Sequence, residues 1–74
     1  MTKRDDTINT LNTMLGDIDH ATDEYHAMTK REHIHGAACL ANRLGLITME
    51  DWEWYDNEAA RACERRYTEL AERR

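Results

Sequence analysis

Apolar side chains recur every three or four residues along most of the chain, which is the spacing of a helix that packs along one face. In the first part of the chain this spacing holds for six positions: Ile8, Leu11, Leu15, Ile18, Thr22 and Tyr25. Asp5 and Asp6 come just before them, where a helix start favours negative charge. The pattern therefore predicts a first helix over residues 5–28.

A capping pattern predicts the start of a second helix. Thr29 and Glu32 have the S/T-x-x-E spacing in which two side chains satisfy backbone donors at a helix N-terminus. An apolar stripe follows at Ile34, Ala37, Ala38, Ala41 and Leu44. We therefore expect a helix over residues 30–44. The alternative is one unbroken helix over residues 5–44, because nothing between Ala27 and Lys30 forbids a helix.

A clear turn signal separates this stretch from the last one. Gly45 suits the left-handed conformation that ends many helices, and Thr48 with Asp51 has the spacing of a second capping pair. The following helix, over residues 49–72, carries its acids first and its bases last, as the helix macrodipole favours. The sequence thus predicts an all-α fold of three helices, with an antiparallel helical hairpin in the C-terminal half.

The chain has 74 residues, three glycines and no proline, and it contains nine alanines. This length suits a single small helical domain over residues 1–74. Alanines let helices approach closely but bury little area each, so one copy has a thin core. A second copy would supply the missing apolar contacts, and we expect a homodimer.

Trp52 and Trp54 pose a question of geometry, because a helix cannot turn both of them inward. At about 100° per residue the two side chains point roughly 200° apart. Trp52 shares its side with Tyr55 and Ala59, which makes Trp52 the expected core residue. Trp54 either covers a neighbouring helix of the same chain or anchors a partner protein, since tryptophan is enriched at binding hot spots.

The acidic neighbours of Trp54 complete the surface that we expect to face a partner. This predicted set is Trp54, Glu50, Glu53, Asp56, Glu58 and Arg61.

Net charge is −5, and its distribution bears on nucleic-acid binding. Residues 1–28 carry two bases and six acids, residues 29–45 carry three bases and one acid, and residues 46–74 carry five bases and eight acids. No concentrated basic face of the kind that binds nucleic acid results, so we expect protein partners. Two alternatives stay open. A DNA-associated regulator of helix-turn-helix type would use Lys30, Arg31 and Arg43, and an acidic DNA mimic would use Asp17, Asp19, Asp23 and Glu24 with the acids of residues 50–58.

Few residue patterns in the chain suggest catalysis or metal binding. Glu32 and His35 have the E-x-x-H spacing of di-iron bundles, but such bundles need two of these motifs and two further glutamates. The four histidines could make stability sensitive to pH near 6. Serine is absent, and there is no phosphate-binding loop or catalytic triad. We expect no enzyme activity, no metal and no cofactor.

Three features of the sequence bear on the cellular compartment: the lack of a membrane-spanning run, the lack of a signal peptide, and the cysteines. No apolar run approaches the roughly 20 residues that cross a bilayer, and no signal-peptide succession opens the sequence. Cys39 and Cys63 stand in unrelated contexts, so we expect reduced thiols and a cytoplasmic location.

The stretch CLANRLGLITMEDWEWYDNEAARACERRYTEL resembles small all-helical accessory proteins of bacteriophages and prophages. The resemblance lies in an alanine-rich helix, a G-L-I-T turn and an acidic aromatic helix. It implies a non-enzymatic protein that binds and modulates a protein in the cytoplasm of a bacterial host. It assigns no role to individual residues.

Overall fold

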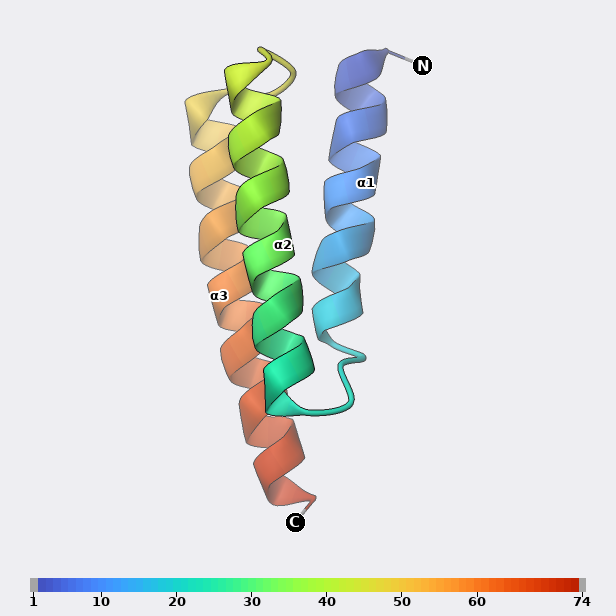
Figure 1. The fold of residues 1–74 in the computed structure, drawn as a ribbon, viewed down its shortest axis with the longest axis vertical. Coiled ribbons are helices and arrows are strands. Elements are labelled where there is room, and N and C mark those ends of the chain that lie inside the picture. The colour runs from blue at the N-terminus through green and yellow to red at the C-terminus, as the bar shows by residue number, and fades with distance from the viewer. Residues whose placement is uncertain (1, 74) are drawn as a thin grey trace.

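The computed structural model describes residues 2–73 and contains three α-helices: α1 (Lys3–Ile18), α2 (Glu24–Arg43) and α3 (Met49–Glu72). They lie side by side in an elongated bundle of 43 × 21 × 15 Å, and α2 runs antiparallel to both α1 and α3 (Figure 1). No strand occurs within the described range. The predicted all-α fold with a C-terminal hairpin is confirmed.

The turn between α2 and α3 has the predicted chemistry. Gly45 adopts φ +76°, its N–H donates to the carbonyl of Asn42, and the N–H of Leu46 donates to the carbonyl of Ala41 at 2.9 Å. These two bonds form the Schellman motif that closes many helices. Thr48 then caps α3 in a complete capping box with Asp51. The residues of this turn therefore set where α2 ends and α3 begins.

The break between the first two helices lies at residues 19–23, so the predicted boundaries 5–28 and 30–44 are wrong, as is the single helix over residues 5–44. Asp23 is the N-cap of α2, and its carboxylate accepts from the backbone N–H of His26 at 2.7 Å. Thr29 lies inside α2, where its hydroxyl donates to the carbonyl of Tyr25 at 2.9 Å. The S/T-x-x-E spacing predicted a cap at Thr29 wrongly, because a threonine hydroxyl inside a helix can also hydrogen-bond to the preceding turn.

Small side chains make up much of the core. Among the described residues the buried apolar positions are Leu11, Ile18, Ala21, Ala27, Ile34, Ala38, Ala41, Ile47, Tyr55, Ala59, Ala62 and Cys63. Half of these are alanines, which permit close helix contacts but leave little room for large side chains from the flanks. Three positions expected on apolar stripes are accordingly exposed: Thr22, Tyr25 at 69% and Leu44 at 65%.

Arg66 ties the connection between α1 and α2 to α3. The residue is only 7% exposed, and its Nε donates to the backbone carbonyl of Ala21 at 2.8 Å. A second guanidinium nitrogen lies 3.4 Å from the Glu69 carboxylate. Because a buried carbonyl oxygen needs a hydrogen-bond partner, Arg66 stabilises the path that the chain takes between the two helices.

We expect Arg66→Met to lower the free energy of unfolding by about 1–3 kcal/mol, because the buried carbonyl of Ala21 loses its donor. Urea denaturation at fixed protein concentration measures the change. Arg65→Met is the matched control, because Arg65 is exposed and its distance to Asp19 is 3.9 Å; it should cost less than about 0.5 kcal/mol. Equal effects of the two substitutions would contradict the role given to Arg66.

The N-cap of α2 predicts a pH dependence. The backbone N–H of His26, followed by its imidazole, holds the pKa of Asp23 below the ordinary value of 3.8. A carboxyl with a lowered folded-state pKa stabilises the fold at higher pH, and this stabilisation is lost as pH falls through the folded pKa.

Wild type should therefore melt above Asp23→Asn at neutral pH, and the difference should shrink as pH falls below about 4. Thermal unfolding followed by circular dichroism measures it. Thr29→Ala serves as the control, since a residue inside a helix tolerates alanine. A difference between wild type and Asp23→Asn that does not change with pH would contradict the stabilising charge of Asp23.

Candidate functional site

Trp54 lies half outside the bundle on α3, with 52% of its surface exposed. Its indole packs edge-on against the ring of Tyr55, with ring centroids 4.9 Å apart. The hydroxyl of Tyr55 donates to the side-chain carbonyl of Asn12 on α1 at 2.7 Å. Burial, followed by the Asp51 carboxylate, raises the pKa of Tyr55 above its usual value. Tyr55 thus holds Trp54 beside the contact between α1 and α3.

Among the residues predicted to face a partner, Glu50, Glu58 and Arg61 lie four or seven positions from Trp54 on α3 and therefore share its face. Arg61 and Glu58 form an ion pair at 2.7 Å. We call these four residues the Trp54 surface. It combines one large aromatic side chain with two carboxylates and one guanidinium.

Asp56 and Glu53 do not join this surface. Asp56 points to α2, where its carboxylate lies 2.8 Å from Nδ1 of His35, and Glu53 is exposed one position from Trp54 and hence about 100° around the helix. The predicted partner-facing set is therefore divided between two sides of α3. Sequence spacing along a single helix could have shown this division.

His35 belongs to a cluster between α2 and α3 that the sequence did not indicate. Its imidazole lies 6.1 Å from the ring of Trp52, and Trp52 packs against the core with its indole N–H buried and without a hydrogen-bond partner. A cavity of about 340 Å³ next to it is lined by Met28, Arg31, Glu32, His35 and Asp56. Nothing in the residue spacing of α2 indicated that Asp56 would face His35, because the pairing depends on the register between helices.

Glu32 and His35, the E-x-x-H pair, both line the cavity of about 340 Å³. Within residues 2–73 no group of three or more histidine, cysteine, aspartate or glutamate side chains is placed to hold a metal ion. Nor does any helix of this range combine the length and the apolar character needed to cross a membrane.

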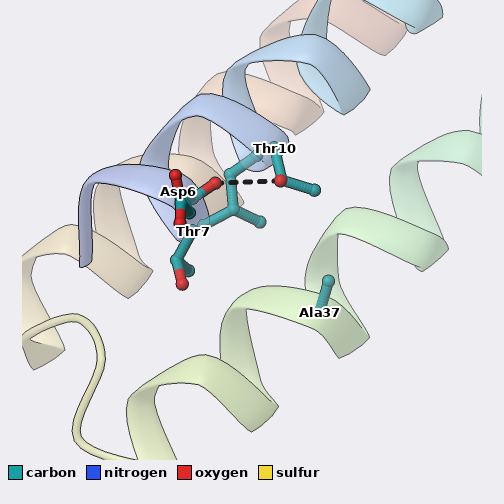
Figure 2. A pocket seen from close by; sticks show the side chains of 5 residues that line it. Asp6, Thr7, Thr10 and Ala37 are labelled. Atoms are coloured by element: carbon teal, nitrogen blue, oxygen red, sulfur yellow. Dashed lines mark hydrogen bonds between the residues drawn. The ribbon is translucent and has the colours of Figure 1, made fainter. Parts of the chain in front are cut away.

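A groove runs between α1 and α2. One cavity in it, of about 230 Å³, is lined by Asp6, Thr7, Thr10, Leu11 and Ala37, and a second, of about 190 Å³, by Met14, Asp17, Lys30 and His33. Figure 2 shows Asp6, Thr7 and Thr10 on α1, facing Ala37 across the groove.

The groove is more apolar than its composition suggests. The hydroxyls of Thr7 and Thr10 donate to the carbonyls of Lys3 and Asp6 on their own helix, at 2.7 and 2.9 Å. The methyl groups of Thr7 and Thr10 then remain to line the groove. On the α2 side Leu40 is 58% exposed, and it follows Ala37 at helical spacing. We use the name α1–α2 groove for the residues lining these two cavities together with Leu40 and Leu44.

No protein-family model, curated protein or solved structure matches this chain.

The two tryptophans should respond differently to truncation. Trp52→Ala should lower the free energy of unfolding by about 3 kcal/mol, because its ring packs against the core. Trp54→Ala should change it by less than about 0.5 kcal/mol and leave helicity at the wild-type level. Circular dichroism during urea denaturation at one fixed concentration measures both. Loss of helical structure in Trp54→Ala would make that residue part of the core.

Proposed function

We propose that the protein is a non-enzymatic protein-interaction module that self-associates as a homodimer and binds a protein of a bacterial host. The observation that carries this proposal is the number of large apolar side chains outside the bundle: Tyr25, Met28, Leu40, Leu44, Met49 and Trp54. Among the described residues, the largest fully buried side chains are Leu11, Ile18, Ile34 and Cys63. Apolar side chains left outside so small a core can be covered by a second copy or by a partner protein.

The Trp54 surface is the part that we assign to the foreign partner. Tryptophan supplies the most contact area of any side chain and dominates many interfaces. The indole is already oriented by Tyr55, so that little freedom is lost when a partner covers it. Glu50 and Glu58 beside it favour a partner surface with basic side chains around an apolar pocket.

The resemblance to small accessory proteins of bacteriophages and prophages agrees with this assignment. Such proteins act in the cytoplasm of the host by binding and redirecting one of its proteins. We extend that role to this chain as part of the proposal.

The alternatives of a DNA regulator and an acidic DNA mimic receive less support. In the helix-turn-helix of DNA-binding proteins the two helices cross at a wide angle, whereas α2 and α3 lie side by side (Figure 1). Several acids are paired within the chain, among them Asp19 with Arg65, Asp51 with Arg4 and Glu58 with Arg61. Pairing of this kind reduces the negative potential that a DNA mimic needs.

The test is retention of host cytoplasmic proteins by the immobilised full chain. Wild type should retain one protein saturably, and Trp54→Ala should weaken that binding at least about tenfold, as the loss of an aromatic hot spot does. Tyr25→Ala is the matched control, because Tyr25 is also an exposed aromatic residue but lies on α2. Equal retention by Trp54→Ala and wild type would contradict the assignment, as would steeply salt-dependent binding of duplex DNA with no protein retained.

A further inference from the structure

A second apolar stripe on α2 is separate from the stripe that faces the core. The buried stripe of α2 consists of Ala27, Ile34, Ala38 and Ala41. Lys30, His33 and Ala37 line the groove, and the exposed Leu40 and Leu44 continue their alternating spacing of three and four. This is the spacing by which one helix packs along another helix. The C-terminal half of this α2 stripe is apolar, and its N-terminal half is basic.

Across the groove, α1 carries a matching stripe with acidic ends. Asp6, Thr10, Thr13 and Asp17 follow one another at spacings of four and three. Asp6 and Thr10 line one cavity of the groove, and Asp17 lines the other. The Thr13 hydroxyl donates to the carbonyl of Asn9 at 3.0 Å, as the other groove threonines do within their own helix. The acids of α1 and the bases of α2 thus border a partly apolar surface.

We propose that a second copy of this chain docks on the α1–α2 groove, with α1 of each copy lying over α2 of the other. The inference rests on the self-association proposed above and identifies the surface that performs it. A two-fold axis parallel to the helices produces this arrangement, and the same patch then serves both copies, as closed dimers require. The other two-fold arrangement within this face would bring α1 against α1 and hence acid against acid.

In the proposed arrangement, acidic residues of one copy lie opposite basic residues of the other, at the same height along the helices. Asp17 lies level with Lys30 and His33 in one copy, because all three line the same cavity. An axis parallel to the helices preserves that level, so Asp17 comes to the partner's Lys30 and His33. In the same way, Thr10 comes to the partner's Ala37, because both residues line the other cavity. Complementary charges at such a rim favour the correct pairing over others.

The size of the face is sufficient. The bundle measures 43 by 21 Å across its broad side, which can hold the roughly 800 Å² that each partner buries in a standard interface. Leu40 and Leu44 would be covered, and α1 and α2 of one copy would face α1 and α2 of the other in a four-helix bundle. Trp54 lies beside the α1–α3 contact, away from this groove, and stays open for a foreign partner.

The first experiment compares solution masses by light scattering over about a hundredfold range of concentration. Wild type should dimerise, and the double variant Leu40→Glu/Leu44→Glu should dimerise at least about thirtyfold more weakly, because two carboxylates would have to be buried without partners. Met28→Glu is the matched control on the other side of α2, where Met28 lines the cavity with Asp56; it should leave dimerisation unchanged. Circular dichroism should show wild-type helicity for both variants, since all three positions are exposed.

The second experiment tests the pairing of α1 with α2 by exchanging charges. Asp17→Lys and Lys30→Glu should each weaken self-association several-fold, because each brings like charges together. Mixed in equal amounts, the two variants should dimerise as well as wild type, because opposite charges then meet at both contacts.

The outcomes separate the two proposals. Unchanged dimerisation of Leu40→Glu/Leu44→Glu, or a mixture no better than its components, would overturn the groove as the interface and leave self-association standing. A wild-type chain that stays monomeric throughout would overturn both self-association and the groove. Retention of a host protein that depends on Trp54 is measured separately and is affected by neither result.

Discussion

Close packing of alanine side chains is the constraint on which the rest of this structure depends. Ala27, Ala38, Ala59 and Ala62 are buried at the helix contacts, and because they bring the helices close together, the bundle is narrow and its core is thin. Large side chains on the flanks cannot turn inward under these conditions. The exposed leucines of α2 and the exposed Trp54 of α3 are therefore consequences of the way the chain packs, and they are the features from which a role in protein binding is argued.

A chain with so thin a core relies on polar contacts to fix its connections. Arg66 reaches from α3 to the carbonyl of Ala21 between α1 and α2, and the Tyr55 hydroxyl reaches from α3 to Asn12 on α1. Both contacts place α1, which is the helix with the fewest buried side chains of its own. They also determine the width of the groove between α1 and α2, because that width depends on where α1 lies.

The proposed functions divide the surface in a physically consistent way. Self-association uses the side of the bundle where α1 and α2 border a groove with acids on one rim and bases on the other. Partner binding uses the side of α3 where Trp54 is held by Tyr55. Because the two surfaces share no residue, one dimer would present two copies of the Trp54 surface, and binding at both could raise the avidity for a multivalent partner.

The sequence by itself determined the helical class, the Gly45 turn, the Thr48 cap and the placement of Trp54 on the side of its helix away from Trp52, because each depends on backbone preferences or on the period of a single helix. Only the tertiary structure decided the rest. α2 begins at the Asp23 cap and not at Thr29, and Arg66 of α3 binds the connection that precedes this cap. The contact of His35 with Asp56 and the groove beside Leu40 arise from the register between helices, and no spacing within one helix specifies that register.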